Sequence, residues 1–282
     1  MAALAVFEEA TLSPKPGLVC PDSSGSHSDM NWITFVMGAA ALAPFWQRQV
    51  MYGIRNEHYK PLNGVAEKLR AMGRRMELAM YEATGGVNTH KGLIFALSLL
   101  LGAWGVCVSG GVSAREDVFA AAGRIISPRM EEELGEIIRK GGRGESLTHG
   151  ESIYFTHGIG GIRTEAARGF PSVKRALEAF EEALGAGASY GNAALRALLL
   201  LMSRCEDTNV MHRGGVDFWR GEYAEWVLEA EGKFDPLEPG DYESVRELDR
   251  LLVVRGVSPG GAADMLACTL FMYRSKISGN MI

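Results

Sequence analysis

Polar and charged residues that could do chemistry gather in glycine-containing segments between apolar stretches. In one of them, Asn88, Thr89 and His90 precede Lys91 at the start of an apolar run. Free backbone N–H groups and the helix dipole favour anions at the start of a helix. The segment therefore predicts a phosphate cradle; the alternative is a glycine turn capped by Asn88 or Thr89, with Lys91 at the surface. The segments of this kind are 13–30, 84–92, 156–171, 206–215 and 258–264.

A lysine between two prolines is the second candidate for contact with an anion. Pro14 and Pro16 fix φ on either side of Lys15, so the ammonium group can be aimed at an anion. A surface turn is the alternative. Asp29 follows at the start of a predicted helix, where it either caps that helix or contributes a carboxylate to a site.

Three more carboxylates lie in or near these segments. Glu77 is on a predicted helix about two turns before segment 84–92, so it faces either the same cleft or solvent. Glu165 shares its segment with Arg163, and Asp207 shares its segment with Arg213. Such combinations can bind a polar anionic substrate, or they can be structural ion pairs.

The standard nucleotide and hydrolase motifs are absent from the sequence. It has no G-x-x-x-x-G-K-[ST] P-loop, and the glycine run at 185–190 follows a helical pattern and lacks the last glycine of a dinucleotide fingerprint. It has neither G-x-S-x-G nor H-E-x-x-H, and the six histidines lack metal-ligand spacing. A zinc enzyme would therefore have to assemble its ligands from distant loops.

The elements that must position these residues are predicted to be helices. Apolar residues recur at helical spacing along almost the whole chain, for example in 69–80, 176–184 and 245–252. No alternating strand pattern competes with this spacing. The pattern predicts an all-α fold of about ten to twelve helices in a single compact domain over residues 1–282.

Local signals predict several boundaries. The uncharged stretch 92–114 indicates a buried central helix over 92–104, followed by a glycine-rich loop, and this is favoured over a membrane span. Separate helices are predicted around 118–126 and 130–138. Ser113 and Glu116 have capping-box spacing, and Ser258 precedes Pro259 at a predicted helix start.

The charge balance argues against a nucleic-acid partner. The 29 Lys and Arg residues against 34 Asp and Glu residues give a net charge of −5, so no basic field surrounds the protein. The four cysteines are widely spaced, which predicts reduced thiols. The first residues lack a basic region followed by an apolar one, so we expect no membrane attachment and a cytoplasmic location.

Six blocks of sequence, in order, resemble the triphosphoribosyl-dephospho-CoA synthase family. The most distinctive are P-K-P-G-L-V from Pro14 and N-T-H-K-G from Asn88. The resemblance implies an all-α enzyme that transfers the 5-triphosphoribosyl group of ATP to the 2′-hydroxyl of 3′-dephospho-CoA and releases adenine. The product would be the prosthetic-group precursor for an acyl carrier protein of citrate lyase or malonate decarboxylase. The sequence departs from the family pattern at Cys20, where an acidic residue is usual. The blocks are 9–17, 25–30, 84–95, 161–171, 207–215 and 258–267.

The resemblance also implies roles for particular residues. Displacing adenine builds oxocarbenium character on the ribose, which calls for a base at the acceptor hydroxyl and a proton or hydrogen bond for the departing adenine. Asp29, Glu77 and Glu165 are the candidate bases. His90 is expected to contact phosphate or to protonate adenine. The residues expected to bind ATP and 3′-dephospho-CoA are Lys15, Pro16, Gly17, His27, Asn88, Thr89, Lys91, Arg163, Asn209 and Arg213.

A magnesium ion is expected to enter with the triphosphate, held by Asp207 or Glu77 directly or through water. The product is expected to pass to the enzyme that attaches the prosthetic group to a carrier protein, and a homo-oligomer is left open. Two other functions are compatible with the same residues. One is an all-α hydrolase that cleaves an N-glycosidic bond with water, and the other is a non-catalytic nucleotide-binding helical protein.

Overall fold

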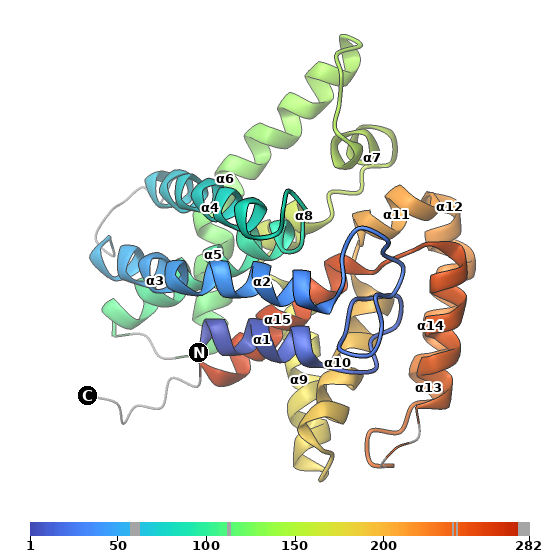
Figure 1. Cartoon of the computed structure of the whole chain (residues 1–282). Coiled ribbons are helices and arrows are strands. Elements are labelled where there is room, and N and C mark those ends of the chain that lie inside the picture. Colours follow the sequence, from blue (N-terminus) through green and yellow to red (C-terminus); the bar gives the residue numbers. More distant parts are fainter. Residues whose placement is uncertain (57–62, 112–113, 239, 241, 276–282) are drawn as a thin grey trace.

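The computed structural model describes residues 1–56, 63–111, 114–238, 240 and 242–275. Figure 1 shows helices packed on helices, and within these residues the sole extended pairing is an isolated bridge between Cys20 and Ser23. The all-α prediction is therefore confirmed. The elements are α1 (Ala2–Thr11), α2 (Trp32–Leu42), η1 (Ala43–Phe45), α3 (Trp46–Arg55), α4 (Asn63–Ala83), α5 (Lys91–Ser109), α6 (Arg115–Gly142), α7 (His149–His157), α8 (Ile162–Ala167), α9 (Pro171–Gly185), α10 (Tyr190–Arg204), α11 (Thr208–Gly214), α12 (Val216–Phe218), η2 (Trp219–Tyr223), α13 (Ala224–Lys233), α14 (Glu243–Arg255) and α15 (Gly260–Arg274).

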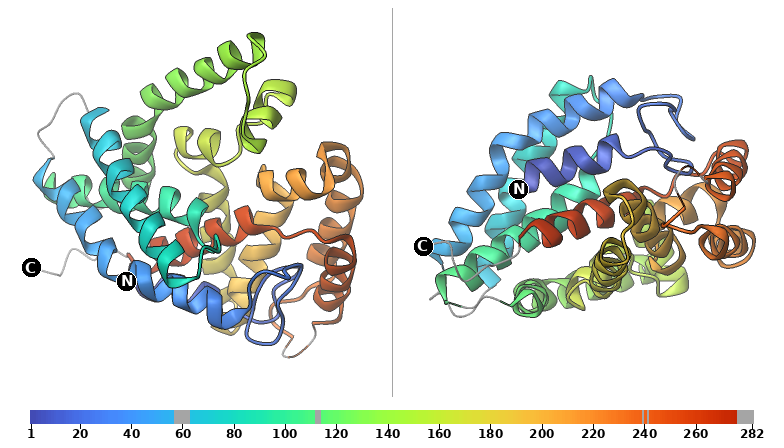
Figure 2. Two further views of the ribbon diagram at one scale, coloured as in Figure 1. Left: turned by 45° about the horizontal axis from the view of Figure 1, so that its top comes forward. Right: turned by 90° about the horizontal axis from the view of Figure 1, so that it is seen from below.

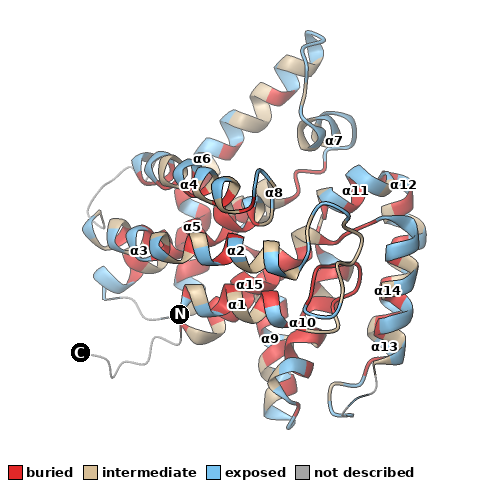
Figure 3. Ribbon diagram, in the orientation of Figure 1, coloured by how far each residue is buried: buried red, intermediate tan, exposed pale blue. Residues whose placement is uncertain are grey.

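Helix α5 lies in the middle of the molecule, where it packs against α3, α4, α6 and α15 and is largely buried (Figure 3). The predicted loop after Trp104 is wrong, because α5 continues to Ser109. Its glycines serve helix packing instead: a Cβ atom on Gly105 would lie 2.3 Å from the carbonyl oxygen of Val50 on α3. The absence of a side chain at Gly105 therefore lets the two helix backbones approach closely.

The apolar length of α5 is accounted for by this packing. Among the described residues, α5 is the one helix long and apolar enough to cross a membrane, with a mean hydropathy of 2.1. Of the most apolar 18-residue stretch of α5, 67% is buried inside the protein. A core helix of this kind gains its stability from removing apolar surface from water.

The two helices predicted around 118–126 and 130–138 form one helix, α6, with Pro128 inside it. The prolyl residue lacks an N–H group for the helix ladder. Next to it, the Ser127 hydroxyl lies 2.7 Å from the carbonyl oxygen of Gly123 and 2.9 Å from that of Ala167, at the end of α8. Helix α6 therefore packs against α8 next to the proline. Beyond this point, the C-terminal half of α6 extends from the body of the molecule, and α7 lies beside it (Figure 1).

Two helix boundaries and the number of helices differ from the predictions. Asn31, not Asp29, caps α2, because its side-chain oxygen accepts the N–H of Thr34 at 3.1 Å. Helix α15 begins at Gly260, one residue later than the predicted start at Pro259. Segments 156–171 and 206–215 are not loops throughout, since they contain α8 and α11, and the described residues form fifteen α-helices rather than ten to twelve. The predicted capping residue Ser113 lies outside the described residues.

The loop between α1 and α2 is fastened to the far end of the sequence. Figure 2 shows this loop (blue) beside α14 (red). The N–H of Gly17 donates to the Asp249 carboxylate at 2.8 Å, and the Ser26 hydroxyl lies 2.6 Å from the carbonyl oxygen of Val257. These contacts hold the loop against α14 and against Val257, the residue before the last glycine-containing segment.

Candidate active site

Residues from all five glycine-containing segments line one cleft of about 450 Å³. The loop after α1 forms one wall, and the starts of α5, α8, α11 and α15 form the others. The lining residues are Glu9, Lys15, Leu18, Val19, His27, Asp29, Met30, Phe35, Asn88, Thr89, His90, Lys91, Gly92, Leu93, Gly161, Ile162, Glu165, Cys205, Glu206, Asp207, Thr208, Asn209, Arg213, Ser258, Gly260, Gly261, Ala263, Asp264 and Met265.

The two long helices that begin at the cleft, α5 and α15, direct their N-terminal ends into it. Neither has a side-chain cap from its own N-cap residue, which is His90 for α5 and Pro259 for α15. The N-terminal end of a helix carries partial positive charge on its backbone N–H groups. The cleft therefore favours an anionic group of a substrate, and Lys91 adds a cation at the same place.

Asp207 joins two of these helix starts from a buried position. Its carboxylate accepts the N–H of Asn209 at 2.9 Å, at the start of α11, and that of Ala262 at 3.0 Å, at the start of α15. A third N–H, from Val210, lies at 3.4 Å. Burial raises the pKa of Asp207, and the backbone N–H groups oppose that rise. Its oxygens are therefore occupied by backbone donors, which gives Asp207 a structural role.

Close approach to Asp207 also explains a glycine in the last segment. A Cβ atom on Gly261 would lie 2.9 Å from the carboxylate carbon of Asp207. On the other side, the amide of Asn209 lies 3.1 Å from the position a Cβ atom would take on Gly260. The paired glycines thus let α15 begin against the side chains of α11.

Glu165 lines the cleft, and its oxygens are bound by the start of α9. They accept the N–H of Ser172 at 2.7 Å and the hydroxyl of Ser172 at 3.1 Å. Burial raises the pKa of Glu165, and the two bonds from Ser172 oppose the shift. Because both of its oxygens are engaged by Ser172, Glu165 stabilises the start of α9 and is poorly placed to act as a base toward a substrate.

Lys15 also lines the cleft, and the anion that it meets belongs to the same chain. Its ammonium lies 2.6 Å from the carboxylate of Glu9 and 2.9 Å from the Glu9 carbonyl oxygen, with both side chains almost fully buried. Burial raises the pKa of Glu9, and the charge of Lys15 opposes the rise. The ammonium also lies 5.4 Å from the centre of the Phe35 ring. Lys15 therefore contributes to the cleft as a member of a buried pair.

The neighbours of Lys15 in the predicted set lie outside the cleft lining. Pro16 and Gly17 do not line it. Gly17 has a φ of 68°, and a Cβ atom there would lie 2.8 Å from the carbonyl oxygen of Val257. The P-K-P-G turn thus requires glycine in order to pack against the segment that leads into α15.

The segment before α5 is both a capped turn and part of the cleft. The Asn88 side chain accepts the N–H of Lys91 at 3.1 Å. The Thr89 hydroxyl lies 2.8 Å from Nδ1 of His90, whose ring packs on Phe35 with centroids 4.2 Å apart. The capped turn is confirmed, and the cap orients residues that line the cleft, while phosphate binding at this segment stays a prediction.

His90 is buried and neutral at physiological pH. Burial, together with the charge of Lys15, lowers its pKa to about 3. Its Nε2 atom is buried without a hydrogen-bond partner among the described residues. An imidazole of this kind cannot supply a proton as an imidazolium near neutral pH, but it can offer one hydrogen bond to a ligand.

His27 links the first segment to the last one. Its Nε2 lies 2.9 Å from the Ser258 hydroxyl, and its Nδ1 lies 3.3 Å from the Asp29 carboxylate and 3.4 Å from a guanidinium nitrogen of Arg213. Burial and the charge of Arg213 lower the pKa of His27. Arg213 also donates to the carbonyl oxygen of Ser26 at 3.0 Å, so it fastens the loop as well as facing the cleft.

Glu77 and Arg163 do not line the cleft but a neighbouring cavity of about 410 Å³, which we call the side cavity. Glu77 lies 3.5 Å from the ammonium of Lys91. Lys91, Gly92 and Ile162 line both spaces and so form the boundary between them. The side cavity is lined by Ala66, Leu69, Arg70, Gly73, Arg74, Glu77, Lys91, Gly92, Ile94, Phe95, Ser98, Leu99, Ile126, Met130, Glu133, Ile162 and Arg163.

Besides Glu9, two further carboxylates of the cleft were not among the predicted site residues. Burial raises the pKa of Asp264 well above its usual range, and a Cβ atom on Gly92 would contact its carboxylate. Glu206 accepts the N–H of Gly161 at 3.1 Å. Both lie inside segments whose polar character was recognised, but their orientation follows only from how α5, α8 and α15 meet.

The arrangement defines a class: an all-helical protein in which helix N-termini, cations and carboxylates converge on a cleft suited to a phosphate-bearing substrate. A family model described as ATP:dephospho-CoA triphosphoribosyl transferase matches residues 1–280. The chain belongs to this family. It is therefore a transferase, and the family uses ATP and dephospho-CoA as substrates.

Curated relatives and a solved structure agree with this assignment. A protein of Streptococcus pyogenes serotype M1, named "Probable 2-(5''-triphosphoribosyl)-3'-dephosphocoenzyme-A synthase", is 35% identical over 285 residues, covering 96% of this chain and 94% of that protein. A protein of the same name from serotype M49 (strain NZ131) is 35% identical over 284 residues, with the same coverage. A crystal structure from Archaeoglobus fulgidus, of a protein assigned as a triphosphoribosyl-dephospho-CoA synthase, covers 87% of this chain and 99% of its own, with a TM-score of 0.56 and 19% identity. That structure supports the fold.

Proposed function

We propose that the cleft binds ATP and that the protein transfers the 5-triphosphoribosyl group of ATP to the 2′-hydroxyl of 3′-dephospho-CoA. In this reaction the bond between C1′ and N9 of ATP breaks, and a bond forms between C1′ and the acceptor oxygen. The hydroxyl proton goes to a base, and adenine leaves with a proton. The observation that carries the proposal is the convergence of the α5 and α15 N-termini with Lys91 in a cleft rich in carboxylates.

The triphosphate is assigned to the N-terminal ends of α5 and α15. Asn88 already accepts the N–H of Lys91, and Asp207 accepts that of Ala262. The assignment therefore relies on the remaining backbone N–H groups at these ends, which favour phosphate oxygens. Lys91, whose side chain is 56% exposed, and Arg213 are the cations that border this region. Lys15 is paired with the carboxylate of Glu9 in a buried position, so we do not assign it a direct contact with phosphate.

The adenine ring is assigned to the region of His90. Nε2 of His90 can donate a hydrogen bond to a ring nitrogen when the Thr89 hydroxyl donates to Nδ1, which lies 2.8 Å away. A hydrogen bond of this kind strengthens as negative charge builds on the departing base. Because its pKa is about 3, His90 acts as a neutral donor and not as the acid that protonates adenine.

Among the three predicted bases, Glu77 is the one that the geometry favours. It lies beside Lys91 at the boundary between the cleft and the side cavity, where two substrates can meet. Glu165 is held by Ser172, and Asp29 lies at the rim with a side chain that is 61% exposed. A carboxylate near the acceptor hydroxyl can take its proton as C1′ is attacked.

The residues present fit a magnesium ion that arrives bound to the phosphates of ATP better than one held permanently by the protein. Within the described part of the chain, no group of three or more His, Cys, Asp or Glu side chains is arranged to hold a metal. Mg²⁺ commonly binds through substrate phosphates, waters and one or two carboxylates. The Asp207 oxygens are bound by backbone N–H groups, so of the two predicted ligands Glu77 fits better, through water. The ion would supply charge neutralisation of the triphosphate.

The product would serve as a prosthetic-group precursor for an acyl carrier protein of citrate lyase or malonate decarboxylase. We place the protein in the cytoplasm, where ATP and dephospho-CoA are available, and assign carrier attachment to a separate enzyme. The support for this setting is the family to which the chain belongs.

The test is adenine release from ATP and Mg²⁺, followed by mass spectrometry, with and without 3′-dephospho-CoA. We expect release that depends on the acceptor, together with an adduct of the mass of triphosphoribosyl-dephospho-CoA. Adenine release without the acceptor would indicate an N-glycosidic hydrolase instead. ATP binding without any release would indicate a nucleotide-binding protein, and either result would overturn the proposal.

A further inference from the structure

The side cavity is a second space of nearly the same size as the cleft, about 410 Å³ against about 450 Å³, and the two share a wall. Helices α4, α5, α6 and α8 form it. The transfer reaction joins two large substrates, and the cleft is suited to one of them. The side cavity is therefore the space in which the second substrate can be sought.

The interior of the side cavity is apolar, unlike that of the cleft. Ile94, Ile126 and Met130 are each almost fully buried and form part of its wall. Ser98 adds one buried hydroxyl to this wall. Such a surface suits a weakly polar chain, because it removes apolar surface from water while offering a polar contact for an amide.

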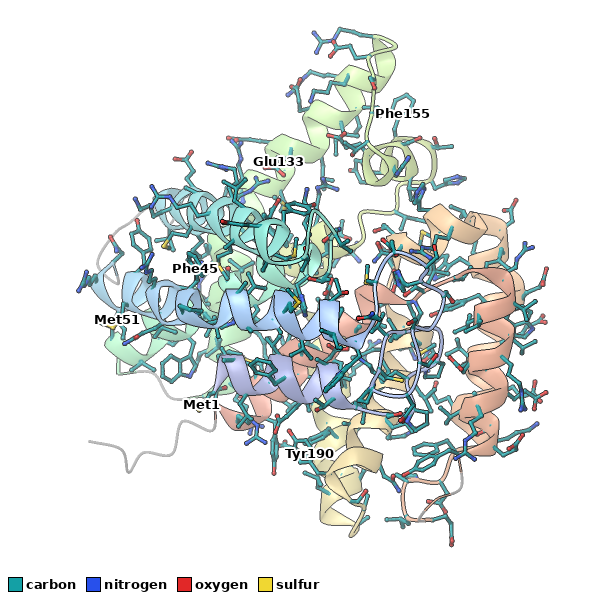
Figure 4. The ribbon with its side chains drawn as sticks, viewed as in Figure 1. Met1, Phe45, Met51, Glu133, Phe155 and Tyr190 are labelled. Atoms are coloured by element: carbon teal, nitrogen blue, oxygen red, sulfur yellow. The ribbon has the colours of Figure 1, made fainter. Side chains whose placement is uncertain are left out.

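The rim of the side cavity is cationic. Arg70, Arg74 and Arg163 line it together. Burial lowers the pKa of Arg70, and the charges of Arg129, Arg163 and Arg74 lower it further. This crowding of like charges is relieved in part by Glu133 on α6, which is labelled in Figure 4. Its carboxylate forms an ion pair with Arg70 on α4. A ligand that carries phosphates would relieve the crowding further, since arginine binds phosphate oxygens in bidentate pairs.

We propose that the side cavity binds the acceptor, with the pantetheine arm of 3′-dephospho-CoA against its apolar wall and the diphosphate at the arginine rim. Dephospho-CoA has these two parts in sequence: a long, mostly uncharged chain and a diphosphate joined to adenosine. ATP has no such chain, so the two substrates are distinguished by the two spaces. The proposal rests on the proposed function for the identity of the acceptor.

The shared wall explains how the substrates would meet. With the diphosphate at the rim, the adenosine of the acceptor lies toward Lys91 and Glu77, at the boundary with the cleft. Gly92 lines both spaces without a side chain, and a Cβ atom there would contact the carboxylate of Asp264 in the cleft. The acceptor hydroxyl would then face the ribose of ATP across this boundary.

The binding test uses 4′-phosphopantetheine, which has the arm without the nucleoside, as the calorimetric titrant. The key variant is Gly73→Leu on α4. A Cβ atom at Gly73 lies 3.5 Å from Ile94, an ordinary contact, so a leucine fits the backbone and fills the cavity. The matched control is Gly64→Leu on the same helix, where a Cβ atom would have nothing within 4 Å. Circular dichroism melting checks that both variants fold.

We expect 4′-phosphopantetheine to bind the wild type and Gly64→Leu alike and to bind Gly73→Leu about tenfold or more weakly, which corresponds to roughly 1.4 kcal/mol. In turnover, it should compete with dephospho-CoA and not with ATP. Equal binding to Gly73→Leu and the wild type, or competition with ATP, would overturn the proposal. Because the binding experiment needs no turnover, its failure is distinct from a failure of the wild type to release adenine.

Discussion

The cleft and the side cavity share Lys91, Gly92 and Ile162 but recognise charge in different ways. In the cleft, backbone N–H groups at helix ends favour binding of an anion. Several carboxylates around them already accept hydrogen bonds from the protein itself: Glu9 from Lys15, Glu165 from Ser172, and Asp207 from backbone N–H groups. In the side cavity, the positive charge comes from guanidinium groups on side chains, above an apolar wall. Backbone donors are fixed by the fold, whereas an arginine rim can be altered without disturbing a helix start.

This difference predicts that substitutions in the cleft affect folding and both substrates, while those in the side cavity affect one substrate. The cleft depends on a few buried polar residues that hold several helices at once. The side cavity depends on side chains that line a space between helices already packed by α5. Four substitutions test this contrast.

The largest expected effect is that of Asp207→Ala on stability. The change leaves the N–H groups of Val210 and Ala262 without their acceptor in a buried setting, and that of Asn209 in a partly buried one. We expect a loss of about 3 kcal/mol or more in the free energy of unfolding, measured with urea, since each buried unpaired donor costs roughly 1 to 3 kcal/mol. Asp217→Ala, on the exposed face of α12, is the control. A loss below about 1 kcal/mol would show that the helix starts do not depend on Asp207.

Glu77→Gln is expected to reduce catalysis with little change in stability. Removing a general base commonly costs a factor of about 100 to 10,000, so kcat should fall by about 100-fold or more. The loss of the water-mediated Mg²⁺ contact assigned to Glu77 should also raise the KM for ATP. Steady-state adenine release measures both. Glu82→Gln, an exposed position on the same helix, is the control. If Asp29→Asn instead causes the large fall in kcat, the base lies at the rim of the cleft and not at its boundary with the side cavity.

Arg163→Ala is expected to separate the two substrates. Losing one guanidinium from the rim should raise the KM for dephospho-CoA by about tenfold, the usual scale for one charged hydrogen-bond partner, and leave the KM for ATP nearly unchanged. Arg168→Ala, at the exposed far end of α8, should change neither. An equal rise in both KM values would remove the distinction between the two spaces.

The smallest expected effect is the pH dependence that His90 gives to stability. Its pKa is about 3 in the folded protein and 6.5 as the ordinary value, so the unfolded chain takes up a proton first as the pH falls. The contribution of His90 to the free energy of unfolding is therefore fully present above about pH 6.5 and falls progressively down to about pH 3. Between about pH 7.5 and 5.5 the free energy of unfolding should fall by roughly 1 kcal/mol because of this residue. Urea unfolding of the wild type and His90→Gln at the two pH values should differ by this amount. His27 shifts in the same direction in both proteins and cancels in the comparison.

Much of the fold could be predicted from the sequence, because helical spacing of apolar residues survives in every long element. The errors occurred where one residue type serves two purposes. Because glycine weakens helices, the sequence predicts a loop at Gly105, but here the glycine allows α3 to pack on α5. Pro128 lies within α6, where Ser127 and the end of α8 surround the break in the hydrogen-bond ladder.

The candidate site was predicted segment by segment and assembled only by the tertiary structure. All five glycine-containing segments contribute residues to the cleft. Yet Glu77 and Arg163 face the side cavity, and Pro16 and Gly17 line neither space. Asp264 escaped prediction, because one carboxylate four residues into a helix looks like any other in a linear sequence.

By itself, the sequence determined that the chain forms helices, where its polar segments lie and to which family it belongs. These properties depend on residue type and spacing along the chain. The tertiary structure decided the partner of each charged group: Glu9 for Lys15, the helix starts for Asp207, and Lys91 for Glu77. The physical reason is that an ion pair or a buried hydrogen bond depends on distance in space and on exclusion of water, and neither quantity is fixed until distant segments pack together.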